Sequence, residues 1–337
     1  MICPGDINEL HEMASRPSEA VMKTLRDIES DILVLGAGGK MGFHLTRMIQ
    51  RALVKVKSDF SVIAVSRFKS QPTIELFEQH GITTIAADLT DDLALAELPN
   101  AQNIFFLAGM KFGTSERLDL LHQMNVELPR RVAARFSSAR IVALSTGCVY
   151  PFVESESGGS VESDLLDPPG DYAKSCVGRE QAFVESVARS SLIRLNYSVD
   201  LRYGVLVDIA NKVISGRSVD LSTGYFNVIW QGDANTYIIC ALERASSPPF
   251  VVNVTGPRTL RVRDVALRFG KLFGKQVDFV GSEKETAWLN NARLCHELWG
   301  PPRIPEDELI EWVAEWLLKG GPTLDKLTHF EVRDGNY

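Results

Sequence analysis

The sequence has few cysteines, no long apolar run and no excess of basic charge. Its five cysteines are scattered, odd in number and without a Cys-x-x-Cys pair, which argues against a disulfide framework and against a zinc site. The longest apolar stretches, such as ILVLGAG and NIFFLAG, are far shorter than the roughly 20 residues of a membrane-spanning helix. A net charge of −7 with interspersed lysines and arginines provides no basic stripe for a nucleic-acid backbone. A small molecule is therefore the expected partner, with neither nucleic acid nor a membrane.

Metal-binding and export motifs are also absent from the sequence. The six histidines are dispersed and no His-Glu-x-x-His or Cys/His spacing occurs, so we expect no metal site. The N-terminal stretch has no basic start followed by an apolar run, which predicts no secretory signal. Together with unpaired, reduced thiols, this favours a cytoplasmic location.

What is present is a long alternation of short apolar runs and helical periods. From residue 31 to about residue 200 this alternation predicts an α/β fold, with a doubly wound parallel sheet of seven strands and right-handed crossovers. Residues 1–30 read as a helical extension in which Ser18 begins a short helix. Residues 201–337 read as a smaller α+β lobe, which includes the segment FVVNVTG. Such an open parallel sheet is typical of a Rossmann fold.

A glycine loop lies between the first apolar strand and the following helix. After ILVL and before FHLTRMI, the chain carries Gly36, Gly38, Gly39, Lys40, Met41 and Gly42. Gly36 permits a tight turn, Gly39 lets the backbone approach a pyrophosphate, and Gly42 lets the helix pack closely on the sheet. The helix N-terminus would face the negative charge. This context favours dinucleotide binding over a purely structural turn.

The end of the second strand bears on the choice between NAD and NADP. An Asp or Glu at this point would bind the ribose hydroxyls of NAD, but the strand ends with Ser66 and Arg67. Arg67, together with Lys40, offers charge-assisted hydrogen bonds to a 2′-phosphate. The pattern favours NADP over NAD, and a solvent-facing arginine is the alternative.

Several segments, in the same order along the chain, resemble the extended short-chain dehydrogenase/reductases, the NAD-dependent epimerase/dehydratase family. The segments are GAGGKMG, AADLTD, NIFFLAG, QMNVELP, ALSTGCVYP, DYAKSCVGRE, IRLNYS and VVNVTG. Besides the glycine loop, the resemblance implies cofactor contacts from Asp88, Leu89, Leu107, Ala108, Gly109, Asn125 and Asn196. It also implies a homodimer formed through the helices that contain Asn125 and Tyr172.

The same resemblance implies a hydride-transfer site. Tyr172 would exchange a proton with a substrate hydroxyl or carbonyl, Thr146 would hydrogen-bond the same oxygen, and Ser145 stands beside Thr146. Many members of the family act on nucleotide-activated sugars, which makes a nucleotide sugar the implied substrate.

The family's lysine, four residues after the tyrosine, is replaced here by Cys176. That lysine lowers the pKa of the tyrosine, and an unperturbed tyrosine with a pKa of about 10 is a poor base at pH 7. Lys111, after the fourth strand, is our first candidate for the missing cation, and Arg179 is the second because helical side chains lean toward the N-terminus. An oxidised nicotinamide ring is a third.

Two classes of function therefore follow from the sequence. The first is an NAD(P)-dependent oxidoreductase, epimerase or dehydratase that acts on a sugar-like hydroxyl compound. The second is a cofactor-binding regulator or scaffold that has lost turnover. Thr146 and Tyr172 favour the enzyme, whereas Cys176 favours the regulator.

Overall fold

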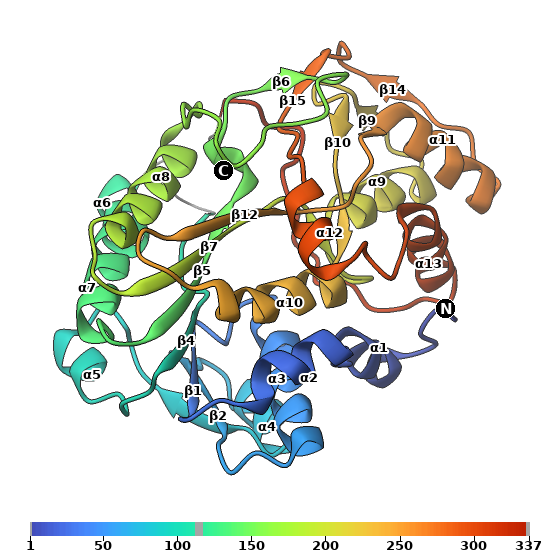
Figure 1. Cartoon of the computed structure of the whole chain (residues 1–337). Coiled ribbons are helices and arrows are strands. Elements are labelled where there is room, and N and C mark those ends of the chain that lie inside the picture. The colour runs from blue at the N-terminus through green and yellow to red at the C-terminus, as the bar shows by residue number, and fades with distance from the viewer. Residues whose placement is uncertain (1, 112–116, 335–337) are drawn as a thin grey trace.

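The large domain is built on a parallel sheet of seven strands with helices on both faces (Figure 1). The computed structural model describes residues 2–111 and 117–334. In spatial order the strands are β12 (Phe250–Val254), β7 (Arg189–Leu195), β5 (Arg140–Thr146), β4 (Asn103–Phe106), β1 (Ile32–Leu35), β2 (Val62–Ser66) and β3 (Thr83–Ala86). Every neighbouring pair is parallel, so the doubly wound sheet predicted from the sequence is confirmed.

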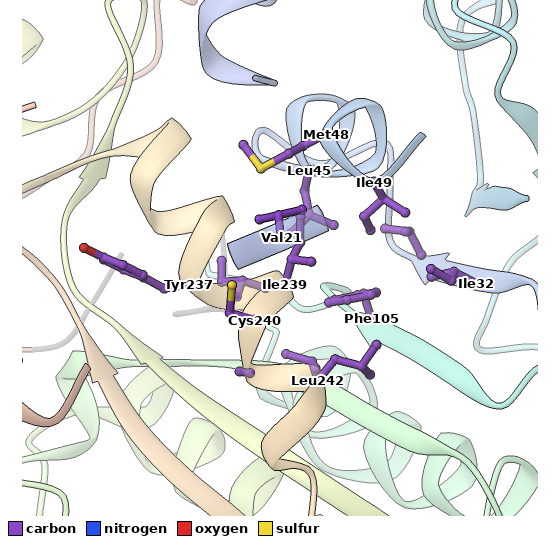
Figure 2. Packing of buried hydrophobic residues seen from close by; sticks show 14 of the residues in the cluster. Val21, Ile32, Leu45, Met48, Ile49, Phe105, Tyr237, Ile239, Cys240 and Leu242 are labelled. Atoms are coloured by element: carbon purple, nitrogen blue, oxygen red, sulfur yellow. The ribbon is translucent and has the colours of Figure 1, made fainter. Parts of the chain in front are cut away.

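The central strand β1, ILVL, is apolar and buried along its whole length because both faces of the sheet are covered. One face carries α2 (Glu19–Arg26), α3 (Gly42–Val56), α4 (Gln71–Glu78) and α10 (Gln231–Cys240). Figure 2 shows Val21, Leu45, Ile49 and Ile239 packed together above Phe105. The other face carries α5 (Asp92–Ala96), α7 (Leu128–Arg135) and α8 (Asp171–Val184). Between α6 (Leu118–His122) and α7, the turn Gln123–Glu127 is π-helical.

Only part of the second half of the chain forms a smaller lobe, because β12 and α10 belong to the large domain. We expected FVVNV in the smaller lobe, but as β12 it pairs with β7 and is the seventh strand of the main sheet. Helix α10 likewise packs on α2 and α3 rather than on the C-terminal helices alone. The chain therefore returns to the large domain after residue 228, and a single boundary at residue 200 does not describe the fold. This return is a tertiary contact that hydrophobic periodicity does not encode.

The smaller lobe lies beside the carboxyl ends of the strands (Figure 1). Its helices are α9 (Val205–Ile214), α11 (Val262–Phe273) and α13 (Glu306–Leu318), whereas α12 (Arg293–Trp299) packs on β12 and α10 of the large domain. Its short strands are β6 (Val153–Glu154), β8 (Ser198–Val199), β9 (Val219–Asp220), β10 (Tyr225–Phe226), β11 (Ile229–Trp230), β13 (Leu260–Arg261), β14 (Phe279–Val280) and β15 (Thr286–Ala287). Trp312 and Trp316 of α13 are buried in the core of this lobe.

The N-terminal extension consists of two helices rather than one. Ser18 caps α2 by accepting a hydrogen bond from the backbone N–H of Val21, as the sequence predicted. Helix α1 (Ile7–Ala14), which we did not expect, is capped by Asp6 and contacts both α3 and α10. The extension is therefore packed against the large domain.

Candidate functional site

Two cavities adjoin at the carboxyl ends of the central strands. The larger, of about 330 Å³, lies over the ends of β5 and β7. The smaller, of about 240 Å³, lies over the ends of β2 and β4. Their walls share Gly36, Gly39, Leu107 and Gly109. In open α/β sheets, ligands bind in this crevice where the strand order reverses, so the two cavities together are the candidate site.

The glycine loop needs its small residues for steric reasons. Gly36 has a φ of +90°, and a Cβ atom there would lie 2.6 Å from the backbone nitrogen of Ala108. A Cβ atom on Gly42 would overlap the carbonyl of Ala37. No side chain caps the N-terminus of α3, which begins at this loop, and an uncapped helix start attracts anions. The loop therefore fits a bound pyrophosphate.

The smaller cavity is lined at the end of β2 by Ser66 and Arg67, and beside β3 by Asp88 and Leu89. The Asp88 carboxylate accepts hydrogen bonds from the backbone N–H and the hydroxyl of Thr90, at 3.0 and 2.7 Å. These bonds hold the pKa of Asp88 below its usual value. Ala108 and Gly38 complete the wall on the side of the glycine loop. The cavity therefore offers both a carboxylate and a guanidinium to a ribose.

Lys40 lies elsewhere than expected. Its Nζ is 3.5 Å from the centroid of the Tyr203 ring, and it lines the larger cavity with Met41. Burial, followed by the charges of Lys326 and Lys111, lowers the pKa of Lys40 to about 8. Lys40 lines the larger cavity and Arg67 the smaller one, so the two residues do not share a cavity wall. The contact with the Tyr203 ring holds the Lys40 side chain in the larger cavity, away from the smaller cavity that Arg67 lines.

Thr146 and Tyr172 both line the larger cavity. Thr146 ends β5, and its hydroxyl oxygen accepts a hydrogen bond from the backbone N–H of Cys148 at 3.2 Å. Tyr172 lies in the first turn of α8. Burial raises the pKa of Tyr172 well above its usual value, and the thiols of Cys176 and Cys148 raise it further. The phenol is therefore protonated at neutral pH.

Cys176 is only 1% exposed and packs with Val149 and Tyr150. Burial raises the pKa of its thiol, which also shares a hydrogen bond with Tyr172. That hydrogen bond raises the pKa of Tyr172, whereas a lysine at the same position would lower it. The structure therefore gives Cys176 the character of a packed, protonated residue.

Both candidate cations line the same cavity as Tyr172. The Lys111 Nζ lies 5.8 Å from the centroid of the Tyr172 ring, and burial lowers the pKa of Lys111. The Arg179 side chain runs back along α8, donating to the carbonyl of Leu144 at 2.8 Å and to Oδ1 of Asn125 at 2.5 Å. The charge of Arg179 lowers the pKa of Tyr172, but less than burial raises it.

Asn125 lies behind the cavity wall rather than on it. Its Oδ1 accepts from the backbone N–H of Met110 at 3.0 Å, and its Nδ2 donates to the carbonyl of Met110 and the hydroxyl of Ser175 at 2.9 Å. These bonds use both ends of the amide, and neither cavity is lined by Asn125. By bonding to both the N–H and the carbonyl of Met110, Asn125 fixes the segment just before Lys111.

Ser145 faces a buried ionic network. Its hydroxyl donates to Glu180 at 2.5 Å, and Glu180 forms an ion pair with Arg194 at 2.8 Å. Arg194 also donates to the Tyr150 hydroxyl at 2.6 Å, and that hydroxyl donates to Asn253. Ser145 lines the cavity, but its hydroxyl already donates its hydrogen bond to Glu180. The network therefore links β5, α8 and β7.

Residues of the lobe and tail also reach the larger cavity. Asn196 lines it while donating to the carbonyl of Trp288 at 3.1 Å. From the lobe and tail, the sequence analysis missed Tyr197, Val199, Tyr203, Gly204, Val205 and Thr328. No local pattern marks these positions, because only the chain's tertiary path brings them together.

Within residues 2–111 and 117–334, no group of three potential ligands is placed to hold a metal ion. Over the same ranges, no helix has the length and apolar character required to cross a membrane.

One protein family matches the part of the chain that contains the glycine loop, Thr146 and Tyr172. Residues 32–190 match the model of the NAD dependent epimerase/dehydratase family. No curated protein sequence matches the chain.

Solved structures with the same fold cover most of the chain. A UDP-glucose 4-epimerase from Thermotoga maritima, solved with UDP-glucose, is 16% identical with a TM-score of 0.69, covering 86% of this chain and 99% of its own. A UDP-glucuronic acid 4-epimerase from Bacillus cereus, solved with UDP-glucuronic acid and NAD, is 15% identical with a TM-score of 0.70 and the same coverage. A short-chain dehydrogenase/reductase superfamily protein from Agrobacterium tumefaciens, solved with NAD, is 17% identical with a TM-score of 0.70, covering 87% of this chain and 98% of its own.

The family match spans the glycine loop, Thr146 and Tyr172. Residues 32–190 are therefore similar to the NAD dependent epimerase/dehydratase family, and the chain has the Rossmann-like fold of the NAD-dependent epimerase structures.

Proposed function

We propose that this protein is an NAD(P)-dependent oxidoreductase, epimerase or dehydratase that acts on a hydroxyl or carbonyl group of a nucleotide sugar. The observation that carries the proposal is that Thr146, Tyr172 and the glycine loop line one cavity, with the Lys111 ammonium 5.8 Å from the Tyr172 ring centroid. The ligands of the similar structures, UDP-glucose, UDP-glucuronic acid and NAD, support it.

The residues present fit a dinucleotide. Gly36 has no room for a Cβ atom beside Ala108, and the uncapped start of α3 suits a pyrophosphate. The smaller cavity, lined by Ser66, Arg67 and Asp88, would then hold the adenosine. When bound, the dinucleotide supplies a hydride donor or acceptor.

Within this proposal, Tyr172 and Thr146 act on the substrate oxygen. Because the pKa of Tyr172 is raised, its resting form is the neutral phenol, which can give a proton to an oxygen that gains negative charge. Thr146 would hydrogen-bond the same oxygen. To take a proton, Tyr172 needs positive charge nearby, and Lys111 and Arg179 are placed to supply it. The site is therefore better prepared to protonate than to deprotonate.

We expect Arg67→Gln to weaken NADP binding about tenfold while NAD binding changes little. The guanidinium would otherwise form charge-assisted hydrogen bonds with the 2′-phosphate, which NAD lacks. Isothermal titration calorimetry with both dinucleotides measures the difference. Lys69→Gln is the matched control, because Lys69 is a neighbouring exposed cation outside the cavity wall. Equal losses for both dinucleotides would contradict the assignment of Arg67.

We expect dinucleotide affinity to fall about tenfold between pH 7 and pH 9.5, and Lys40→Met to remove much of this fall. Below its pKa of about 8, Lys40 is charged and attracts the pyrophosphate, whereas above that value it is neutral. Binding measured at several pH values tests this. Lys55→Met, an exposed lysine at the far end of α3, should keep the wild-type pH dependence. An unchanged pH dependence in Lys40→Met would rule out this role.

The proposal includes a homodimer formed through the helices that contain Asn125 and Tyr172. Leu118 of α6 and Val184 of α8 are exposed apolar residues on these helices. Sedimentation equilibrium gives the mass of the protein in solution and decides this point.

A second candidate function is a cofactor-binding regulator without turnover. The hydrogen bond between Tyr172 and Cys176 favours it, because this bond raises the pKa of Tyr172. A regulator of this type would bind a dinucleotide at the glycine loop without acting on a sugar.

The two functions are separated by one experiment. The purified protein is incubated with NAD or NADP and a panel of nucleotide sugars and sugar acids, while absorbance at 340 nm is followed and products are analysed by mass spectrometry and NMR. Product analysis is essential because an epimerase produces no net absorbance change. Turnover of one sugar supports the enzyme; dinucleotide binding without product from any of them supports the regulator.

A further inference from the structure

Gln231 presents a buried carboxamide to the larger cavity. It is the first residue of α10, is only 3% exposed and lines the cavity with Gly42 and Tyr203. Its Oε1 lies 2.7 Å from Nδ1 of His44. The carbonyl end of the amide is therefore taken, and the NH₂ group is the end that remains for the cavity.

His44 is linked in turn to His11 of the N-terminal extension. Nε2 of His44 lies 2.8 Å from Nδ1 of His11. Burial lowers the pKa of His44 to about 4 and that of His11 to about 3, so at neutral pH each ring carries a single N–H. The three side chains thus form one hydrogen-bonded chain from α1 to the cavity.

The direction of this chain follows from its chemistry. A carboxamide oxygen can only accept, so His44 must carry its proton on Nδ1. Its Nε2 is then an acceptor, and His11 must donate from Nδ1. The proton position on His11 thus determines the tautomer of His44, and the His44 Nδ1–H group holds the Oε1 atom of Gln231. The NH₂ group of Gln231 is thereby left for the cavity.

The N-terminal extension packs firmly against α3, so its His11 side chain is held in place beside His44. The His11 ring makes an edge contact with Phe43, with centroids 5.0 Å apart. Glu12 forms ion pairs with Arg47, at 3.1 Å, and with Arg51. Val21 of α2 packs with Met48 and Ile49 of α3 beside α10, as Figure 2 shows.

We propose that Gln231 donates a hydrogen bond to a phosphoryl oxygen of the bound dinucleotide, and that His44 and His11 position it for this. The inference rests on the proposed function, since it takes the cavity to bind a dinucleotide. A phosphoryl oxygen is the fitting acceptor because α3 and α10 both begin at this wall, and neither start is capped by a side chain. The positive ends of both helices and Lys40 face the same space. The N-terminal extension, which lies outside the family match, is thus a working part of the site.

The test compares NAD affinities of the full-length protein and its variants by calorimetry. Gln231→Met keeps the length of the side chain but removes the donor, and should weaken binding about tenfold, as expected for a hydrogen bond to a charged group. Gln231→Glu adds a negative charge beside the phosphate and should weaken binding about a hundredfold.

His11 is tested by a pair of variants. In His11→Asn the amide nitrogen can replace Nδ1 as the donor, so affinity should stay within about twofold of the wild type. His11→Leu keeps an apolar contact with Phe43 but donates nothing, and should weaken binding several-fold. His80→Leu is the matched control, because His80 also contacts Phe43, with ring centroids 5.6 Å apart, and should leave affinity unchanged. In ¹⁵N NMR spectra of the wild type, His44 should show the Nδ1–H tautomer.

The outcomes separate this inference from the proposed function. If the wild type binds NAD and both Gln231 variants bind it equally well, the inference is wrong and the proposed function stands. If the wild type binds neither NAD nor NADP, the proposed function itself fails. Equal affinities for His11→Asn and His11→Leu would remove the role of His11. Circular dichroism checks the fold, and if His11→Leu does not fold, the Gln231 variants and the His44 tautomer decide.

Discussion

Tyr172→Phe is expected to lower kcat by about a thousandfold while NAD affinity stays within about twofold of the wild type. The change removes the phenolic proton and leaves the ring, which lies 5.8 Å from the Lys111 ammonium, in place. A positioned acid or base contributes about 10²–10⁴-fold to rate. Among the tyrosines that line the cavity, Tyr172 is the one whose spacing from Thr146 in the sequence carries the resemblance to the family. The effect belongs to the chemical step rather than to binding.

Steady-state kinetics on the nucleotide sugar that the screen identifies would measure this effect. Tyr225→Phe is the matched control, because Tyr225 lies in β10, outside the cavity wall, and its variant should turn over normally. If Tyr172→Phe retains most of its activity, Tyr172 is not the acid or base, and Lys111 becomes the next candidate. A thousandfold loss of kcat with unchanged NAD affinity would support the proposed chemistry despite Cys176.

Glu180→Leu is expected to lower the free energy of unfolding by about 3–5 kcal/mol, as found when one partner of a buried pair is removed. Glu180 and Arg194 face each other at 2.8 Å, with side chains 4% and 5% exposed. The glutamate also holds the pKa of Arg194 above its usual value, so the guanidinium stays charged. Without Glu180, a buried charge would remain beside the phenol of Tyr150, which cannot neutralise it.

Urea denaturation followed by circular dichroism would measure the change. The double variant Glu180→Leu/Arg194→Met is the matched control, because it removes both charges and should recover most of the lost stability. A loss below about 1 kcal/mol in the single variant would show that water reaches the pair. Since Glu180 also accepts a hydrogen bond from the Ser145 hydroxyl and lies on α8 with Tyr172, the loss of Glu180 should disturb the site as well.

The parts of the fold that could be predicted depend on short stretches of sequence. Short apolar runs such as ILVL and IFF indicated strands, because a strand that is covered on both faces is largely apolar. Ser18 marked a helix start because its side chain bonds within the same turn. Gly36 marked the loop because its positive φ and its contact with Ala108 exclude a side chain.

The surroundings of other residues depend on distant partners that the sequence does not indicate. Asn125 was expected to contact the cofactor, but its amide is used by Met110, Ser175 and Arg179. Lys40 was expected beside Arg67, but it packs on Tyr203 instead. In both cases the residue type was chemically suitable. Which side chains Asn125 and Lys40 contact depends on how the helices and the smaller lobe pack together.

By itself, then, the sequence determined the alternating fold, the glycine loop and the order in which Thr146 and Tyr172 follow it, because these features depend on residues close together in the chain. Only the tertiary structure decided that FVVNV completes the main sheet, that Lys111 and Arg179 share a cavity with Tyr172, and that His11 reaches Gln231 through His44. His11 and His44 are 33 residues apart, and His44 and Gln231 are 187 apart. Such contacts arise when separate elements pack, and hydrophobic periodicity records which face of an element is buried but not which partner covers it.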